Sequence, residues 1–313
     1  MIISKPKFWD KKISFLAVLL LPLSVIFIIF IFLKKKFTST KVFKIPIICI
    51  GNIYLGGTGK TPACIFLANE LSKTGKKTVI LRKYYKEHND EYKLIREKFK
   101  NVIINKSRDC GIRDAERSDF DIVILDDGFQ DYKIKKNLNI ICFNQNQLIG
   151  NGLVLPSGPL RENLTVLKYA HIIIINGRKN TSFEDKLLKI NNKLEFFYSS
   201  YKPLNLDNFK NRKLLALAGI GNPENFFNLM EQNNLKIEKK IIFPDHYIIS
   251  KNEIQKIINE AESKNLKIIM TEKDYFKINS YKLEKIDYLK ISLEIEEKAK
   301  FINKVKLLYD KNN

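Results

Sequence analysis

The residues best suited to chemistry form one run, Leu55-Gly56-Gly57-Thr58-Gly59-Lys60-Thr61-Pro62. The run lies between an apolar, strand-like stretch (45–50) and a helix-like segment (63–73), which is where a phosphate-binding loop operates. Glycines let backbone N–H groups turn toward one anion, and the helix N-terminus adds partial positive charge. The pattern predicts a nucleotide site in which Lys60 reaches the β- and γ-phosphates and the Thr61 hydroxyl ligates Mg²⁺. The expected phosphate-binding residues are Gly56, Gly57, Thr58, Gly59, Lys60 and Thr61.

The phosphate loop departs from the full G-x-x-x-x-G-K-[ST] pattern at one position. A glycine is expected at position 54, where this chain has Tyr54. The alternative interpretation is a glycine-rich turn that merely closes a strand. The strand and helix on either side favour the phosphate loop.

A second stretch ends an apolar run with two acids, in residues 121–130 (DIVILDDGFQ). A buried strand of this kind delivers a carboxylate to the sheet edge beside a phosphate loop, where Mg²⁺ is held. Asp126 lies 65 residues after Thr61, a spacing that suits the two halves of one nucleotide site. We therefore expect Asp126 and Asp127 at the metal, with a simple strand-terminal turn as the alternative.

Other polar residues are candidates for the remaining chemistry. His246 follows a predicted strand in Phe243-Pro244-Asp245-His246-Tyr247, where it could act as a base or orient a carboxylate. Arg108 and Arg161 are candidate phosphate clamps, because a guanidinium group binds phosphate through two hydrogen bonds. Either arginine could instead be a surface residue. Residues 150–162 are too long and too rich in Gly and Pro for a mere turn, and we expect a functional loop.

The elements that must position these residues alternate between strand and helix. The chain has 313 residues, enough for two domains. The predicted fold is α/β, with a P-loop NTPase-like parallel sheet domain, a smaller α/β domain and an N-terminal membrane-anchoring helix. The expected divisions are an anchor (1–37), a P-loop domain (38–193), a β-strand linker (194–212) and a C-terminal domain (213–313). Strands are expected at 45–50, 78–81, 102–104, 121–126, 138–143, 171–176, 194–201, 213–218, 237–243, 267–270 and 286–293, and helices at 63–73, 91–99, 108–117, 223–232, 253–263 and 294–308.

The anchor is predicted from the uncharged segment Ile13–Leu33, which has lysines on both sides. As one helix it would span roughly 30 Å, about the thickness of a bilayer core. It lacks the short apolar core and small-residue cleavage site of a signal peptide. Pro22 could kink the helix, so a helix lying in the membrane interface and a buried core helix are the alternatives. The nucleotide loop and the lysine-rich remainder predict that the rest of the chain is cytoplasmic.

The composition narrows the class of partner. The chain has 55 basic and 34 acidic residues, a net charge of +21, which suits phosphates or an acidic membrane surface but is also explained by solvated lysines. No nucleic-acid-binding module is recognisable, and no nucleic-acid partner is expected. The cysteines, Cys49, Cys64, Cys110 and Cys142, form no C-x-x-C pair and predict neither a zinc site nor a disulfide framework.

Taken together, these segments resemble the tetraacyldisaccharide 4′-kinase family, the lipid A kinases of Gram-negative bacteria. Further matching segments occur in the family's order across nearly the whole chain, and the family also lacks the first glycine of the phosphate loop. They are LPLS (21–24), GN-x3-GGTGKTP (51–62), Asp90-Glu91, ILDDGFQ (124–130), GNG-x-x-LPSGPLRE (150–162), ING (175–177), AGIGNPENFF (218–227), FPDH (243–246) and TEKD (271–274).

The resemblance implies transfer of the γ-phosphate of ATP to the 4′-hydroxyl of a tetraacyldisaccharide 1-phosphate, giving lipid IVA. It implies ATP and Mg²⁺ as cofactors, the inner-membrane lipid surface as a partner with no obligate protein partner, and an active site that faces the cytoplasm. By the same resemblance Asp90 is the general base and His246 orients it, with Lys60 and Asp127 also catalytic. Arg108 and Arg161 match nucleotide-site positions, and Thr61, Asp126, Asp127 and Glu162 match the metal site.

The chain departs from the family's pattern in two places. The family has S-R-G-Y-G and a longer excursion before its aspartate, whereas residues 82–92 here are shortened and contain no glycine. The family also has histidine where this chain has Asp131.

Two other function classes remain open from the residues alone. A membrane-tethered P-loop ATPase or GTPase would use hydrolysis to switch a partner, but the second domain with its FPDH segment favours a kinase. A non-catalytic nucleotide-binding scaffold would not require Asp126 and Asp127.

Overall fold

The protein is described by a computed structural model that covers residues 6–10, 14–245, 247–281 and 283–311. The chain forms two compact units. The larger unit contains the described residues of 5–84, 101–200 and 294–313, and the smaller unit contains those of 85–100 and 201–293. The strands β7 and β12 continue from one unit into the other.

An eight-stranded sheet organises the larger unit, in the order β12-β7-β6-β5-β1-β4-β2-β3. The pairings from β7 through β3 are parallel. Strands β1, β4 and β5 are buried at every position, as expected for apolar runs in a sheet that is covered on both faces. The strands are β1 (Ile47–Gly51), β2 (Thr78–Lys83), β3 (Val102–Asn105), β4 (Ile122–Asp126), β5 (Leu138–Asn144), β6 (Ile172–Asn176), β7 (Glu195–Pro203) and β12 (Ile291–Ile295).

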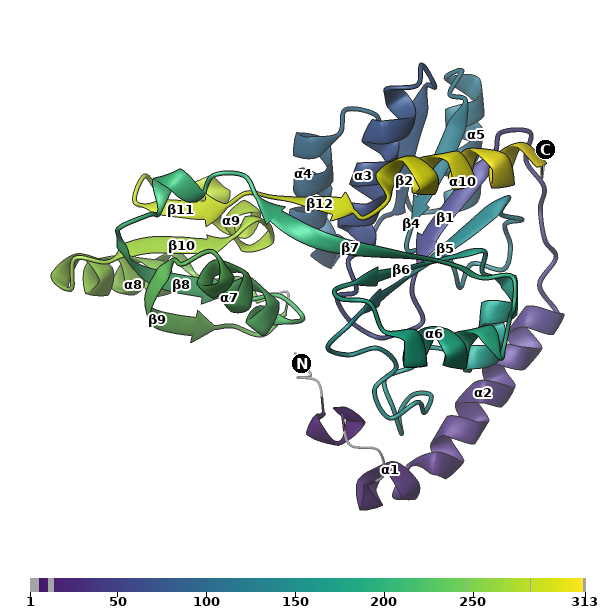
Figure 1. Cartoon of the computed structure of the whole chain (residues 1–313), viewed down its shortest axis with the longest axis horizontal. Coiled ribbons are helices and arrows are strands. Elements are labelled where there is room, and N and C mark those ends of the chain that lie inside the picture. The colour runs from purple at the N-terminus through teal and green to yellow at the C-terminus, as the bar shows by residue number, and fades with distance from the viewer. Residues whose placement is uncertain (1–5, 11–13, 246, 282, 312–313) are drawn as a thin grey trace. The chain divides into compact units, whose positions relative to one another are not determined.

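Helices cover the two faces of this sheet (Figure 1). On one face Ile47 and Cys49 share a core with Ile112 of α5 (Arg108–Arg117) and Leu187 of α6 (Thr181–Leu188). The helices α3 (Lys60–Ser72) and α10 (Lys298–Lys311) pack together on the other face. Short 3₁₀ helices are η1 (Lys7–Asp10) and η3 (Leu164–Tyr169).

We expected one continuous helix in the N-terminal apolar segment, and this expectation was wrong. It forms α1 (Phe15–Leu19) and α2 (Leu21–Lys36), which meet at Leu20. Pro22 lies in the first turn of α2 and has no N–H group with which to continue the preceding helix. Among the residues described, no helix is both long enough and apolar enough to cross a membrane.

The smaller unit has a four-stranded parallel sheet in the order β11-β10-β8-β9. The strands are β8 (Lys213–Ala218), β9 (Lys236–Ile242), β10 (Lys267–Thr271) and β11 (Ile286–Leu289). The helices are α4 (Asn89–Lys98), α7 (Pro223–Gln232), α8 (Lys251–Ser263) and α9 (Glu272–Ile278), with 3₁₀ turns η2 (Lys86–His88), η4 (Leu206–Asn208) and η5 (Asn279–Tyr281).

The compact units differ from the expected divisions because α4 belongs to the smaller unit and α10 belongs to the larger unit. Helix α4 packs against α9, with Tyr92 and Ile95 as its buried apolar residues, and so belongs to the smaller unit. Helix α10 joins the larger unit, where Phe301 lies 5.1 Å from Phe197 between ring centroids. The described residues of the expected anchor do not form a separate unit, since α2 packs on the larger unit through Phe27. The expected strand at 286–293 is divided into β11 and β12, and α6 and α9 were not predicted.

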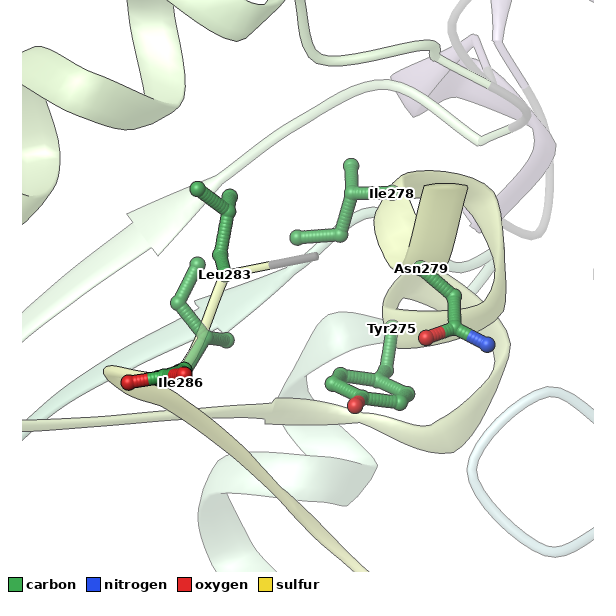
Figure 2. Close-up of a pocket in the computed structure, with 6 residues that line it drawn as sticks. Tyr275, Ile278, Asn279, Leu283 and Ile286 are labelled. Atoms are coloured by element: carbon green, nitrogen blue, oxygen red, sulfur yellow. The ribbon is translucent and has the colours of Figure 1, made fainter. Parts of the chain in front are cut away.

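Two hollows lie away from the candidate site residues. A cavity of about 280 Å³ in the smaller unit is lined by residues around the C-terminal end of α9, including Tyr275 and Ile278 (Figure 2). A depression of about 1090 Å³ in the larger unit lies before β1 and β4, at the edge of the sheet opposite the phosphate loop.

Candidate active site

The phosphate loop joins β1 to α3, as the sequence predicts. Gly59 is the N-cap of α3 with φ +90°, a left-handed conformation that favours glycine, and Lys60 begins the helix. Asn52 holds the loop from within, because its side-chain amide donates to the carbonyls of Tyr54 (2.7 Å) and Gly56 (3.2 Å) and to the Thr58 hydroxyl (3.0 Å). The shape of the loop is therefore supported by hydrogen bonds within the protein itself.

The residue at the missing glycine position has a structural role. Tyr54 is fully buried and forms an antiparallel bridge with Leu160. On either side of this bridge the Leu55 N–H donates to the Pro159 carbonyl (2.8 Å) and the Arg161 N–H donates to the Ile53 carbonyl (2.7 Å). The loop 150–162 is thus paired with the strand-like start of the phosphate loop, which explains why a bulky residue is accommodated at position 54.

Asp126 ends β4 beside the first turn of α3. Thr61 donates its hydroxyl to Asp126 Oδ2 at 3.0 Å. Arg82 of β2 pairs with the same oxygen and also lies 3.1 Å from the Thr61 hydroxyl. The β-sheet register places Arg82 directly beside Asp126, and all of these groups lie at the carboxyl edge of the sheet.

Asp127 lies between two cations. Its Oδ1 atom is 3.9 Å from Lys60 Nζ and 2.9 Å from the Arg161 guanidinium. Burial alone would raise the pKa of Asp127, but the charges of Lys60 and Arg161 outweigh burial and lower this pKa to about 2. Burial lowers the pKa of the Lys60 ammonium, and Asp127 opposes that shift. Asp127 is therefore a carboxylate at any physiological pH.

Arg108 lies at the start of α5 and is buried against the turn that follows β4. It donates to the Asp127 carbonyl at 2.6 Å and to Asp131 at 3.2 Å. Asp131, which stands where the family has histidine, is thus the ion-pair partner of Arg108. Gln130 in the same turn donates to the Asn52 carbonyl at 2.9 Å and so connects this turn to the phosphate loop.

Glu162 follows Arg161 but points toward another group of residues. Its carboxylate accepts a hydrogen bond from the Tyr132 hydroxyl, and the Lys35 ammonium lies over the Tyr132 ring, 4.8 Å from its centroid. Burial raises the pKa of Glu162 to about 7, against the opposing effect of Lys35. No interaction with Asp126 or Asp127 is found for Glu162 among the described residues.

The donor atoms near the phosphate loop suit Mg²⁺. Mg²⁺ prefers hydroxyl, carboxylate and phosphate oxygens and is usually held by one or two carboxylates together with a substrate phosphate. Thr61 and Asp126 supply such oxygens, and Asp126 Oδ1 is buried without a hydrogen-bond partner among the described residues. Among all residues that the structure describes, no cluster of three or more His, Cys, Asp or Glu side chains could hold a metal by itself.

The loop 150–162 is also fastened to the N-terminal helices. Ser24 of α2 is buried, and its hydroxyl lies 2.9 Å from the Val154 carbonyl and 2.8 Å from the Ser157 hydroxyl. The indole N–H of Trp9 donates to the Pro156 carbonyl at 3.1 Å. One side of this loop therefore holds α2, while the other side pairs with the phosphate loop.

Asp90 lies in the smaller unit, in the first turn of α4, which begins at Asn89 and so includes Asp90, whereas the helix was expected to begin at residue 91. It is buried, with 5% of its surface exposed, and neither carboxylate oxygen has a hydrogen-bond partner among the described residues. His246 lies outside the described residues.

The larger unit brings together the predicted residues of the phosphate loop with Asp126, Asp127, Arg108 and Arg161. Sequence reasoning missed Arg82 and Asn52 as members of this site. A signal for Arg82 existed, because a charged residue that ends an apolar strand of a parallel sheet lies at the same edge as the acid of a neighbouring strand. The signal for Asn52 was its place directly after β1, where a short side-chain amide with two N–H donors can reach the carbonyls of the loop.

The family model described as "Tetraacyldisaccharide-1-P 4′-kinase" matches residues 16–309. A tetraacyldisaccharide 4′-kinase of Pelagibacter ubique (strain HTCC1062) is 40% identical over 318 residues, covering 99% of each chain. One of Haemophilus influenzae (strain 86-028NP) is 30% identical, covering 89% of this chain and 86% of the relative.

A solved structure shares the fold. The crystal structure of the "apo" form of LpxK from Aquifex aeolicus in complex with ATP matches with a TM-score of 0.71 and 24% identity, covering 94% of this chain and 99% of that one. At this identity the likeness supports the fold, whereas the family model and the relatives decide the family. On that evidence the chain belongs to the tetraacyldisaccharide-1-P 4′-kinase family.

Proposed function

We propose that the enzyme transfers the γ-phosphate of ATP to the 4′-hydroxyl of a tetraacyldisaccharide 1-phosphate. The observation that carries the donor half is the arrangement of Lys60, Thr61, Asp126 and Asp127 at one edge of the sheet. The family carries the acceptor half, since its relatives are named for this lipid sugar.

The residues of the larger unit act on the phosphates. The backbone N–H groups of the loop and the Lys60 ammonium bind the β- and γ-phosphates, and Arg161 adds a guanidinium for charge that develops during transfer. Thr61 and Asp126 would hold Mg²⁺, which neutralises phosphate charge when bound. Asp127 keeps Lys60 and Arg161 oriented until the nucleotide arrives.

Asp90 is the proposed general base for the acceptor. Its buried carboxylate has free acceptor capacity among the described residues, which suits a group that must take a proton from a sugar hydroxyl. We propose that His246 orients this carboxylate, following the family match. Transfer of the hydroxyl proton to Asp90 leaves the sugar oxygen to attack phosphorus, and ADP leaves with the broken bond's electrons.

The helices α1 and α2 are the proposed membrane-binding element. They carry apolar side chains that are largely exposed, among them Phe15 (81%), Phe30 (62%) and Phe32 (62%), and α2 ends in Lys34-Lys35-Lys36. An apolar surface beside a lysine cluster suits a helix pair that lies in the interface of an anionic bilayer. We propose attachment to the inner membrane with the active site facing the cytoplasm, where ATP and the acyl chains of the acceptor are both available.

The kinase proposal is tested by phosphate transfer from ATP that carries ³²P in its γ-phosphate to a tetraacyldisaccharide 1-phosphate in detergent micelles. We expect labelled lipid, and we expect ATP turnover to depend on the acceptor. Hydrolysis of ATP at the same rate without acceptor, together with unlabelled lipid, would overturn the proposal in favour of a nucleotide switch.

Membrane attachment is tested separately with vesicles that contain phosphatidylglycerol. Replacing Phe30 and Phe32 together by Asn should reduce co-sedimentation with the vesicles and leave ATP binding unchanged. Ile248→Asn is the matched control, because Ile248 is an exposed apolar residue (71%) of the smaller unit. Equal vesicle binding by the double variant and the wild type would contradict the proposed attachment.

A further inference from the structure

The segment Thr271-Glu272-Lys273-Asp274 forms the N-terminal turn of α9, and its residues reach in different directions. Asp274 points into the smaller unit, where its carboxylate accepts from the Gly219 N–H (2.7 Å) and the Thr271 hydroxyl (2.6 Å). Lys277 pairs with the other oxygen of Asp274 at 2.7 Å. This buried network fixes the start of α9 against the loop that follows β8.

The same loop supports the segment that ends in Asp245. A side chain at Gly219 would lie 3.2 Å from Phe243 Cβ and 3.5 Å from the Pro244 carbonyl oxygen, so the two segments approach closely. The Phe243 N–H also donates to the Ala218 carbonyl at 2.8 Å. The backbone that leads to Asp245 is therefore held at the carboxyl end of β8.

Lys273 connects this segment to α4. Its ammonium lies 3.0 Å from Glu91 Oε1 in the first turn of α4 and 3.1 Å from Asp245 Oδ1. The Lys273 and Glu91 side chains are mostly buried, with 17% and 16% exposed, so water screens this pair less than a surface pair. Glu91 directly follows Asp90 in the chain, and Asp245 directly precedes His246.

An ammonium group between two carboxylates has a specific mechanical effect. With Lys273 present, Glu91 and Asp245 are both attracted to one ammonium group. Glu91 also lies 3.3 Å from His88 Nδ1, but that contact does not involve Asp245. Loss of Lys273 would therefore weaken the attraction between the two segments and leave two like charges near each other. A movement of Glu91 would also displace Asp90, because the Asp90 carboxylate has no hydrogen-bond partner among the described residues that would hold it in place.

We propose that Lys273 is a positioning residue of the phosphotransfer reaction, which ties the α4 turn that carries Asp90 to the segment that leads to His246. This inference rests on the proposed function, in which Asp90 is the base. Lys273 acts on the turnover of the bound acceptor and not on ATP, whose loop lies in the larger unit.

The test compares Lys273→Met with Lys98→Met. Lys98 is a matched control because it also joins α4 to the first turn of α9, through Glu272, but at the other end of α4. We expect Lys273→Met to lower kcat by about 10- to 100-fold, the scale of a misplaced catalytic group, with the KM for ATP little changed. Lys98→Met should change kcat much less, and Lys273→Arg should restore part of the activity.

A second measurement separates positioning from general damage. In the Asp90→Ala background, Lys273→Met should have little further effect on kcat, because the group that it positions is already gone. Thermal unfolding of each variant checks that the chain is folded.

Several outcomes would overturn the inference while the proposed function stands. They are an unchanged kcat in Lys273→Met, an equal loss in Lys98→Met, and a full further loss when Lys273→Met is added to Asp90→Ala. If the wild-type enzyme labels no lipid, the proposed function itself has failed, which is a different result.

Discussion

Asp126 and Asp90 are both buried carboxylates, but their surroundings are opposite. Asp126 is paired with Arg82 and accepts from Thr61, whereas Asp90 has no hydrogen-bond partner among the described residues. The region that receives a highly charged ligand keeps its own charges paired in advance. The region that we propose receives a neutral hydroxyl keeps a carboxylate without a hydrogen-bond partner among the described residues.

This contrast has a chemical reason. A buried charge without a counterion is costly, so the phosphate side is stable without ATP only if its acids and bases neutralise one another. A general base must accept a proton from its substrate, and a carboxylate already saturated with hydrogen bonds would do so poorly.

The largest predicted effect comes from removing the open carboxylate. Asp90→Ala should lower kcat by about 10²- to 10⁴-fold, the range for loss of a general base, without weakening ATP binding. It should not destabilise the fold, because a buried carboxylate without a partner contributes nothing favourable there. Steady-state kinetics and thermal unfolding measure both effects. Glu97→Gln, an exposed acid on the same helix, is the control, and full activity in Asp90→Ala would show that another group is the base.

On the phosphate side, Arg82→Met should destabilise the protein, whereas Asp90→Ala should not. Leaving Asp126 buried without its counterion should lower the free energy of unfolding by about 3 kcal/mol, as measured by urea denaturation. Adding Asp126→Asn to this variant should recover part of the loss, since the unpaired charge is then removed. A double variant less stable than Arg82→Met would contradict this pairing.

The raised pKa of Glu162 predicts that the free energy of unfolding depends on pH. Its folded-state pKa of about 7 lies above its ordinary value of 4.5, so the folded protein binds this proton more tightly than the unfolded chain. The contribution to stability is complete below about pH 4.5 and is lost as the pH rises through about 7, a change on the order of 3 kcal/mol. Glu162→Gln should remove this slope from unfolding free energies measured between pH 4.5 and 7.5. Parallel curves for the two proteins would show that Glu162 titrates normally.

The smallest effect concerns the contact between α2 and the loop 150–162. Ser24→Ala removes the hydroxyl shared by Val154 and Ser157 and should lower the free energy of unfolding by about 2 kcal/mol. Vesicle binding should be retained, because Ser24 faces the protein. Thr38→Val, which removes an exposed hydroxyl near the end of α2, should have a smaller effect on stability. Equal stability losses in the two variants would refute the special role of Ser24.

Much of the phosphate side could be predicted from the sequence because its signals are local. The order of strand, loop and helix around Lys60, and the apolar strand that ends at Asp126, are both patterns of adjacent residues. The partners of these residues were not predictable. Arg82 reaches Asp126 only through the parallel register of β2 and β4, and Asn52 acts through loop carbonyls whose directions the sequence does not specify.

The limits of the compact units depend on long-range packing and differ from the divisions expected from the sequence. Helix α4 packs on α9, although the chain on both sides of α4 belongs to the larger unit. Helix α10 packs on the larger unit through Phe301, although residues 201–293 before it belong to the smaller unit. The apolar periodicity of each helix does not indicate which unit the helix packs against. The break between α1 and α2 was within reach, since Pro22 marked the point, but a continuous apolar run outweighed it in the prediction.

The loop 150–162 contacts α2 through Ser157 and the phosphate loop through Pro159 and Arg161. A ligand that immobilises one of these neighbours therefore also reduces the fluctuations of the other, and the two binding events are thermodynamically linked in both directions. The amides of α2 should exchange with deuterium more slowly once ATP is bound, although α2 (Leu21–Lys36) contributes no residue to the predicted phosphate site. In this enzyme, occupancy of the nucleotide site would thereby be communicated to the helix that we propose binds the membrane.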